Sequence, residues 1–306
     1  MKFGTVALLG RPNVGKSTLV NALVGQKVAI VSPRPQTTRH RIVGVRTEPR
    51  GQVVLFDLPG VHRPLFRMNV QMMHLARETI KEVDVVLQLF AADEPPGHGE
   101  AFVVSLVAEL PTPVILVPNK MDLPAARRNL GERVAFYTTK HSYAAVVPCS
   151  ALTGEGVAGL LEKLFALLPE GEPLLPPDLT TTQSERFYVA ELIREALLER
   201  VEKELPFTTA VLLRHMEEEE RPGQAPSMRI WADILVEAES QKAIVVGKGG
   251  RMIKAIGTAA RERIEKLLGV ALFLDLRVKA RPGWRNKEHV LAELEPLEVP
   301  WGGEQN

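Results

Sequence analysis

The sequence predicts an α/β P-loop domain with a mostly parallel sheet and helices on both faces, followed by a smaller α+β domain. Residues Gly10–Ser17 read GRPNVGKS, which matches the phosphate-binding pattern G-x-x-x-x-G-K-[ST]. Residues Asn119–Asp122 read NKMD, which matches the N-K-x-D element that reads guanine. Residues Gly247–Gly250 read GKGG and have the G-x-x-G spacing of a nucleic-acid clamp. The first two motifs, in this order, indicate a Ras-like P-loop GTPase fold for the first domain.

The phosphate loop lies between a predicted strand and a predicted helix. Phe3–Leu9 is an apolar run typical of a buried parallel strand, and apolar residues recur at helical spacing after the loop. Backbone N–H groups of such a loop point at phosphates, and the helix N-terminus adds partial positive charge. We expect Lys16 to reach the β- and γ-phosphates and the Ser17 hydroxyl to bind Mg²⁺. The other loop residues expected to contact the nucleotide are Arg11, Asn13, Val14, Gly15 and Thr18.

Two further segments are predicted to sense the γ-phosphate. Asp57–Gly60 follows the strand-like run Val53–Phe56 and fits D-x-x-G. In this pattern Asp57 holds Mg²⁺ through its hydration shell, and the Gly60 N–H meets the γ-phosphate. The polar segment between Ile30 and Arg41 should supply a threonine that reaches Mg²⁺ only while the γ-phosphate is present. Thr38 is the first candidate for this Mg²⁺ ligand and Thr37 the second, so Lys16, Thr38 and Gly60 are predicted catalytic residues.

The base is expected to be guanine. The buried strand Val114–Val117 leads into the NKMD element, in which the Asp122 carboxylate can accept from the N1–H and N2–H₂ groups that adenine lacks as a pair. This residue therefore argues against a P-loop ATPase. Asn119 should tie its loop to the phosphate loop, and the Lys120 stem should lie along the ring. Ser150 and Ala151 follow another strand-like run and fit the last guanine loop, whose backbone N–H meets the base oxygen.

Composition and length set the domain organisation. With 306 residues, of which 45% are hydrophobic, the chain is long enough for about two domains. We expect a GTP-binding domain over residues 1–170, a proline-stiffened linker over 171–180, an RNA-binding domain over 181–280 and a basic C-terminal tail over 281–306. The single cysteine, Cys149, suits a reducing cytoplasm and is predicted to be buried. The net charge of +1 does not indicate any class of binding partner, and no apolar run approaches transmembrane length.

The second domain has the element order α-β-β-α-α-β, which with a G-x-x-G loop between the two central helices is the order of a type II KH domain. Such a loop clamps about four nucleotides of single-stranded RNA. The residues predicted to contact RNA are Gly247, Lys248, Gly249, Gly250, Arg251 and Lys254. Ile244, Val245 and Ile253 offer an apolar platform for bases. A glycine C-cap with a turn between helices is the alternative interpretation of GKGG.

The basic residues outside this loop leave two interpretations open. Arg281 and Trp284 lie in a basic run that could continue the RNA path, with charge for phosphates and an indole for stacking. The same run could be a solvated tail with one anchoring Trp. The cluster Arg34, Arg39, His40 and Arg41 is ambiguous in the same way.

These motifs together resemble the Era family of bacterial ribosome-assembly GTPases over nearly the whole chain. The resemblance rests on GRPNVGKST, QTTRHR, D-x-P-G, N-K-x-D, SA and VVGKGG followed by a helix. It implies a monomeric, cytoplasmic GTP switch that uses GTP and Mg²⁺. It also implies binding to the single-stranded 3′ region of 16S ribosomal RNA, action in rRNA maturation and 30S subunit assembly, and peripheral contact with the inner membrane. Leu58 departs from the family, which usually has Thr at this position.

The hydrolytic machinery lacks one Ras-type residue. Val61 follows Gly60 where Ras-type GTPases place a Gln that orients the attacking water. In families with this phosphate loop, Asn13 resembles the residue that holds a K⁺ beside the β- and γ-phosphates, so we count Asn13 as a catalytic candidate and K⁺ as a candidate cofactor. Two hypotheses follow: an enzyme whose GTP state times RNA engagement, or a constitutive RNA-binding protein that uses GTP mainly for stability.

Overall fold

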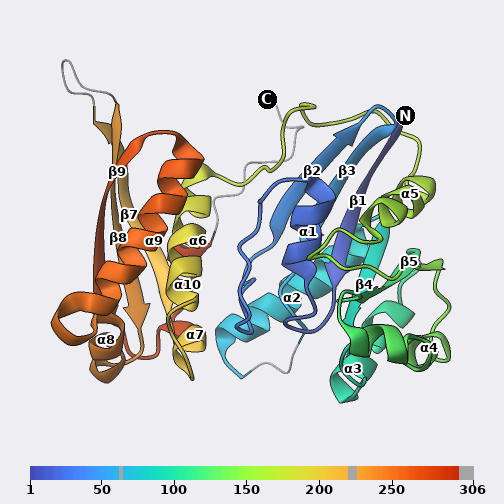
Figure 1. Cartoon of the computed structure of the whole chain (residues 1–306), viewed down its shortest axis with the longest axis horizontal. Coiled ribbons are helices and arrows are strands. Elements are labelled where there is room, and N and C mark those ends of the chain that lie inside the picture. Colours follow the sequence, from blue (N-terminus) through green and yellow to red (C-terminus); the bar gives the residue numbers. More distant parts are fainter. Residues whose placement is uncertain (62–64, 220–225, 296–306) are drawn as a thin grey trace. The chain divides into compact units, whose positions relative to one another are not determined.

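The computed structural model describes residues 1–61, 65–219 and 226–295. The described chain divides into two compact units: the first contains residues 1–61, 65 and 69–182, and the second contains residues 183–295 together with 66–68 (Figure 1). Part of the predicted tail over 281–306 lies outside the described residues.

The first unit is built on a six-stranded sheet with the order β2-β3-β1-β4-β5-β6 (Figure 1). All neighbouring strands are parallel except β2, which pairs antiparallel with β3. The strands are β1 (Lys2–Leu9), β2 (Ile42–Glu48), β3 (Gly51–Asp57), β4 (Val85–Ala91), β5 (Val114–Asn119) and β6 (Ala145–Val146). The predicted mostly parallel α/β sheet is thereby confirmed.

Helices cover both faces of this sheet. On one face α1 (Lys16–Val24) and α5 (Val157–Leu167) pack on alternate residues of β1, β3, β4 and β5. On the other face α2 (Arg67–Glu82) and α3 (His98–Ala108) pack on the intervening residues. Helix α4 (Pro124–Thr138) contributes Ala126 and Tyr137 to a smaller cluster with β4 and β5. Because the central strands are buried on both faces, their sequences are continuous apolar runs.

The carboxyl ends of the parallel strands place the motifs at one edge of the sheet. The phosphate loop follows β1, Asp57 ends β3 and Asn119 ends β5. Ligands bind outside the carboxyl ends of such strands. The predicted phosphate, Mg²⁺ and base elements therefore meet at this edge although they lie far apart in the chain.

The predicted linker over 171–180 is held to the first unit. The Gln52 side chain exchanges two hydrogen bonds with the backbone of Leu175, at 2.9 and 3.0 Å. Farther along, the Val45 N–H donates to Thr180 O at 2.8 Å, and the Thr181 hydroxyl donates to Val43 O at 2.6 Å. The last two bonds satisfy the Val45 N–H and the Val43 C=O of β2, which is an edge strand and needs partners for them. The segment is therefore an added layer on the first unit and not a free spacer.

The second unit contains the predicted order of helices and strands around a three-stranded sheet, β7-β8-β9 (Figure 1). β7 and β8 are antiparallel, whereas β8 and β9 are parallel. The elements are α6 (Glu185–Leu198), the short α7 (Leu205–Thr208), β7 (Ala210–Glu219), β8 (Ser227–Val236), α8 (Glu239–Val246), α9 (Arg251–Leu268) and β9 (Ala271–Ala280). The type II KH fold is confirmed, and α6 begins at a true N-cap because the Ser184 hydroxyl accepts from Phe187 N–H.

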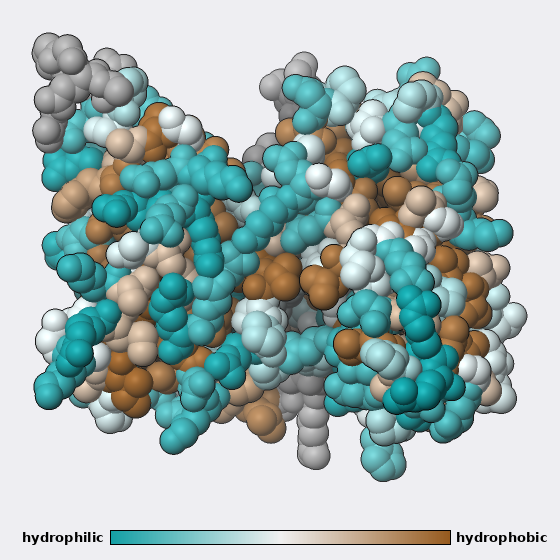
Figure 2. All heavy atoms as spheres, in the orientation of Figure 1, coloured by the Kyte–Doolittle hydropathy of each residue, from teal (hydrophilic) through white to brown (hydrophobic). Residues whose placement is uncertain are grey.

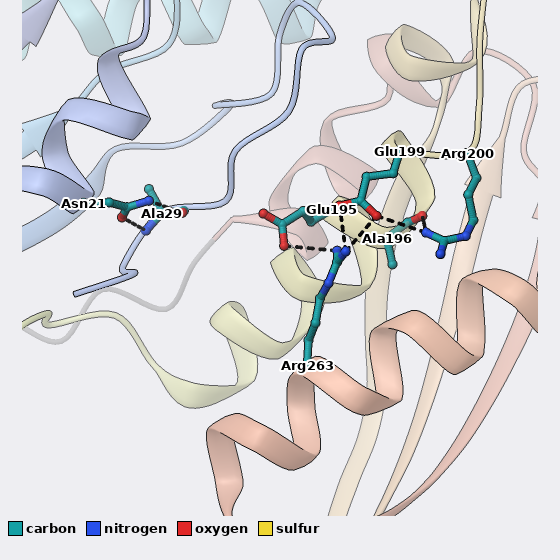
Figure 3. Close-up of polar contacts among 7 residues, drawn as sticks. All are labelled: Asn21, Ala29, Glu195, Ala196, Glu199, Arg200 and Arg263. Atoms are coloured by element: carbon teal, nitrogen blue, oxygen red, sulfur yellow. Dashed lines mark hydrogen bonds and ion pairs between the residues drawn. The ribbon is translucent and has the colours of Figure 1, made fainter. Parts of the chain in front are cut away.

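An ion-pair cluster joins α6 to α9 within this unit. Arg263 of α9 donates to Glu195 at 3.1 Å and to both carboxylate oxygens of Glu199 at 2.6 and 2.7 Å (Figure 3). Next to it, Arg200 donates to Ala196 O at 2.9 Å. Because Glu195 is buried, its charge needs such a partner. The cluster fixes α6 against the helix that follows the G-x-x-G loop.

The described part of the predicted tail is folded. A 3₁₀ turn over Trp284–Asn286 leads into α10 (Glu288–Leu294). Trp284, Val290 and Leu291 are buried, and the Trp284 indole N–H donates to Thr208 O at 2.9 Å. The prediction that the Trp284 indole stacks on RNA is therefore wrong, and its anchoring role is the one the structure supports. The apolar residues spaced among the charges explain why this segment packs.

We expect Trp284→Phe to destabilise the second unit without weakening RNA binding. The change leaves Thr208 O buried without its donor and creates a small cavity, which should cost about 2 kcal/mol. The free energy of unfolding can be measured by urea titration, followed by the fluorescence of Trp231. Phe273→Ala is the contrasting variant: because Phe273 is exposed, its removal should leave the free energy of unfolding almost unchanged. An unchanged unfolding free energy with weakened RNA binding in Trp284→Phe would restore the stacking role.

Hydrophilic residues cover most of the visible surface of both units, and hydrophobic residues form smaller groups among them (Figure 2). Cys149 is buried, as predicted, and burial raises the pKa of its thiol to about 12. Among residues 1–61, 65–219 and 226–295, no helix is both long and apolar enough to cross a membrane.

Candidate nucleotide site and RNA groove

A cleft of about 420 Å³ lies at the carboxyl edge of the first sheet. The predicted residues that line it are Asn13, Gly15, Lys16, Ser17, Thr18, Thr37, Thr38, Gly60, Asn119, Lys120, Asp122 and Ala151. Four other predicted residues do not line the cleft: Arg11, Val14, Asp57 and Ser150. Each of them is hydrogen-bonded to a residue that does. The structure thus gathers the phosphate, Mg²⁺ and guanine motifs around one cavity.

The phosphate loop is shaped by close backbone approaches. Gly15 has φ +96°, and a Cβ there would lie 2.2 Å from Asn119 Nδ2, so no other residue fits. Lys16 is 5% exposed and its ammonium donates to Arg11 O at 3.0 Å and to Gly10 O at 3.3 Å. Burial lowers the pKa of Lys16 to about 8, partly offset by the charge of Asp57. A phosphate beside this ammonium would favour its charged form.

Three side-chain oxygens converge beside the phosphate loop. The Ser17 hydroxyl donates to Asp57 Oδ2 at 2.5 Å and lies 2.9 Å from the Thr38 hydroxyl, which itself donates to Asp57 Oδ2 at 3.2 Å. Asp57 is fully buried, and its Oδ1 has no hydrogen-bond partner among the described residues. Burial raises the pKa of Asp57, whereas Lys16, Ser17 and Thr38 oppose that shift. A buried carboxylate with an unpaired oxygen beside two hydroxyls fits Mg²⁺, which prefers hard oxygen ligands.

The geometry distinguishes the two threonine candidates. The Thr38 hydroxyl points at Ser17 and Asp57, whereas the Thr37 hydroxyl donates to Arg34 O at 2.6 Å. The segment that precedes them is held by Asn21 of α1, whose side chain bonds to both the N–H and the C=O of Ala29 (Figure 3). The structure therefore favours Thr38 as the Mg²⁺ ligand, which was the first candidate.

The guanine elements are joined by side-chain hydrogen bonds. Asn119 Nδ2 donates to Val14 O at 2.8 Å, which ties the base loop to the phosphate loop as expected. The Ser150 hydroxyl donates to Asp122 Oδ1 at 2.6 Å and so orients the carboxylate. The Ala151 N–H donates to Asn119 Oδ1 at 2.9 Å and so ties the last guanine loop to the NKMD element. Ala151 lines the cleft, and the predicted contact of this loop with the base oxygen stays a prediction.

Sequence patterns missed part of the cleft lining and misplaced one side chain. Pro12, Val31, Ser32, Pro33, Gln36, Leu123 and Leu152 also line the cleft. Leu152 is 78% exposed, which leaves an apolar surface beside the base loop. The Arg11 side chain points away from the cleft to Glu100 of α3, so Arg11 can serve the nucleotide only through its backbone.

The G-x-x-G loop of the second unit depends on its glycines. Gly247 has φ +73° and its Cβ would lie 2.7 Å from the Met252 Cβ, whereas Gly249 and Gly250 also have positive φ with open space around them. Lys248 is exposed at the tip of the loop, and Arg251 Nε donates back to Lys248 O at 3.3 Å. The turn therefore presents its backbone and Lys248 to the exterior, as a clamp on a phosphate backbone requires.

A groove of about 470 Å³ runs between α9 and β9. Ile253 and Lys254 line it, as do Arg261 and Phe273, which sequence reasoning did not single out. The platform prediction is only partly correct: Ile244 is 51% exposed, but Val245 is fully buried and cannot touch a base. Helical spacing from Lys254 could have pointed to Arg261, seven residues on and on the same face.

Arg281 is not among the residues that line this groove. The backbone N–H of Arg281 donates to Val236 O at 2.8 Å, and its guanidinium lies 3.7 Å from the carboxylate of Glu293 in α10. The predicted RNA contact of Arg281 has therefore no support from the groove. Its observed partners make it part of the packing of the last helix.

Known proteins resemble both units and the whole chain. A family model described as a 50S ribosome-binding GTPase matches residues 5–120, and a KH domain model matches residues 212–285. GTPase Era of Heliobacterium modesticaldum is 41% identical over 291 residues, which cover 95% of this chain and 96% of that protein. GTPase Era of Geobacter metallireducens is 44% identical over the same length and the same shares of each chain.

Two solved structures are similar over nearly the full length. One is Era in complex with MgGDPNP and nucleotides 1506–1542 of 16S ribosomal RNA, with a TM-score of 0.90, 34% identity, and coverage of 96% of this chain and 98% of that one. The other is a variant of Aquifex aeolicus Era bound to GDP and AlF₄⁻, with a TM-score of 0.87, 34% identity, and coverage of 96% and 99%. The likeness thus includes both units in one chain.

Proposed function

Because the chain belongs to the Era family of GTPases, we propose that it is a GTP-controlled switch that binds the single-stranded 3′ region of 16S ribosomal RNA. In this role it acts in rRNA maturation and in assembly of the 30S subunit. One observation carries the proposal: a single chain combines a guanine-nucleotide cleft with a G-x-x-G loop, which leads into the helix whose residues Lys254 and Arg261 line a groove. The similar Era structure holds a GTP analogue and 16S ribosomal RNA together, which supports the small subunit as the partner.

Two described residues lie where their position can depend on the presence of the γ-phosphate. Thr38 reaches the Ser17–Asp57 pair from the loop before β2, and Gly60 lies against Pro12 of the phosphate loop. Ser17 and Thr38 would hold Mg²⁺ directly and Asp57 through water, and the ion neutralises charge on the β- and γ-phosphates. Loss of the γ-phosphate removes one partner from both segments, so they are the parts of the first unit that change with nucleotide state.

Hydrolysis must proceed without a side chain that orients water at position 61. Val61 is buried and its N–H donates to Gly10 O at 3.0 Å, so it holds the loop and offers no group to water. Asn13 is exposed in the cleft with φ +64°, and its Nδ2 donates to Pro33 O at 2.9 Å. Asn13 would bind K⁺ there, which would supply positive charge where other GTPases use an arginine.

GTP turnover should accordingly be faster in K⁺ than in Na⁺ at equal ionic strength. Asn13→Ala removes the amide that faces the nucleotide edge, and it should abolish the difference between the two salts. The measurement is steady-state phosphate release in each salt. Equal rates for the unaltered protein in K⁺ and Na⁺ would eliminate the role of K⁺.

The switch is tested by the affinity for RNA in different nucleotide states. If GTP favours the RNA-competent state, RNA must tighten GTP by the same factor, and typical couplings of about 1–3 kcal/mol give about 5- to 150-fold. We expect tighter binding of a 16S 3′-end oligonucleotide with a non-hydrolysable GTP analogue than with GDP. Titrations with the analogue, with GDP and without nucleotide measure this directly. Three identical affinities would leave the constitutive RNA-binding protein as the better description.

We further propose that the protein works as a cytoplasmic monomer on the 30S subunit and contacts the inner membrane only peripherally. The family resemblance supports this location. Flotation of the purified protein with vesicles of anionic lipid tests the membrane contact, and light scattering tests the monomer. Failure to float at low salt would remove the membrane from the proposal.

A further inference from the structure

Arg11 occupies a junction between three parts of the nucleotide site. Its own carbonyl accepts a hydrogen bond from Lys16 Nζ at 3.0 Å. On one side, Gly10 O accepts from the Val61 N–H at 3.0 Å. On the other side, Pro12 lies so close to Gly60 that a Cβ on Gly60 would fall 2.7 Å from Pro12 N. The position of residues 10–12 therefore sets where Lys16 and Gly60 stand.

The Arg11 side chain is anchored outside the cleft. Its Nη1 donates to Glu100 Oε1 at 2.6 Å, and Glu100 is 8% exposed. The other carboxylate oxygen of Glu100 accepts from the Gly97 N–H at 2.8 Å and so caps α3. A Cβ at Gly99 would lie 2.7 Å from Arg11 Nε, so the guanidinium fits against the first turn of α3 only because residue 99 has no side chain. Charge-assisted bonds of this length are among the stronger ones in proteins.

We propose that Glu100 is a positioning residue for GTP hydrolysis: its ion pair with Arg11 holds residues 10–12 so that Gly60 and Lys16 meet the γ-phosphate. The inference rests on the proposed GTPase function. Nothing in the phosphate-loop pattern points to Glu100, because it lies 89 residues from Arg11 in the chain.

The pair should matter more for GTP than for GDP. The γ-phosphate is the only phosphate that Gly60 is expected to contact, whereas Gly15, Lys16 and Ser17 also bind the phosphates that GDP retains. Misplacement of reacting groups by an ångström can cost about 100-fold in rate. Loosening the Arg11–Glu100 contact should therefore lower turnover and GTP-analogue affinity while GDP affinity stays close to normal.

The test compares Glu100→Gln, Arg11→Gln and the double variant with the unaltered full-length protein. The amide that Glu100→Gln introduces still offers a carbonyl oxygen to the Gly97 N–H, and Arg11→Gln leaves the α3 cap untouched. We expect each single change to lower kcat about tenfold with GDP affinity within about twofold. Because the two residues act as one unit, the double variant should be no slower than either single variant. Glu94→Gln is the control, since Glu94 raises the pKa of Arg11 through its charge without a hydrogen bond to it.

Each outcome decides the proposal. Lower kcat with retained GDP affinity and non-additive effects supports it. Unchanged kcat in both single variants overturns it. So does an equal loss of GDP and GTP-analogue affinity together with a lower unfolding temperature, because that pattern marks a purely structural contact. If the unaltered protein hydrolyses no GTP, the proposed function itself fails; if it does and the variants match it, only this inference fails.

Discussion

Asp122→Asn should exchange guanine selectivity for xanthine selectivity. The carboxylate accepts two donors from guanine, and each such charged hydrogen bond contributes about 1.5–3 kcal/mol. Their loss should weaken GTP by about two to four orders of magnitude. Ser150 donates to Asp122 Oδ1, so an asparagine would keep its oxygen toward Ser150 and turn its NH₂ toward the base. Xanthine has a carbonyl where guanine has its amine, and it can accept from that NH₂.

Competition of GDP and xanthosine diphosphate for a fluorescent nucleotide measures this exchange. Asp93→Asn is the matched control, because it removes the same charge beside the same loop, 3.4 Å from the Lys120 ammonium, but does not line the cleft. It should leave the preference for guanine unchanged. Equal affinity of the unaltered protein for ATP and GTP would refute the role of Asp122 outright.

The site was largely predictable because its contacts come from short motifs at strand ends. Strand, loop and helix around Lys16 impose one geometry, and the same holds where Asp57 and Asn119 end their strands. The cleft lining from Val31 to Gln36 was not predictable, since it depends on the path of a loop with no fixed pattern. Glu100 was not predictable either, because its partner is chosen by packing of α3 against the phosphate loop.

The fold was predictable where hydrophobic periodicity is strong and less so at segment boundaries. The parallel strands are continuous apolar runs, and the order of the second unit follows from its alternating elements. The segment over 171–180 is rich in proline and polar residues, which is the composition of a linker, yet it pairs with an exposed strand edge. Trp284 stands among basic residues, and only the tertiary structure shows that its indole finds Thr208 and the core.

Reversing the charge of the G-x-x-G loop should abolish RNA binding without affecting the nucleotide. Lys248→Asp with Gly249→Asp places two carboxylates where phosphates must approach. Loss of the charged contact alone is worth about 1.5–3 kcal/mol, so with the added repulsion RNA affinity should fall by at least about 100-fold. GTP affinity should stay near normal, because the cleft belongs to the first unit.

The structure supplies a control that separates this effect from damage to the fold. Gly249 has φ +61° and open space around its Cβ position, and Gly269 at the other end of α9 has φ +70° and equally open space. Asp tolerates this backbone conformation better than most residues. Lys266→Asp with Gly269→Asp therefore makes the same chemical change on the same helix, away from the loop. Binding of the 16S 3′-end oligonucleotide should survive in this control and fail in the loop variant. If both variants bind RNA as the unaltered protein does, the loop is only a turn between helices; if both fail equally, the general charge of the unit, and not a clamp at Gly247–Gly250, holds the RNA.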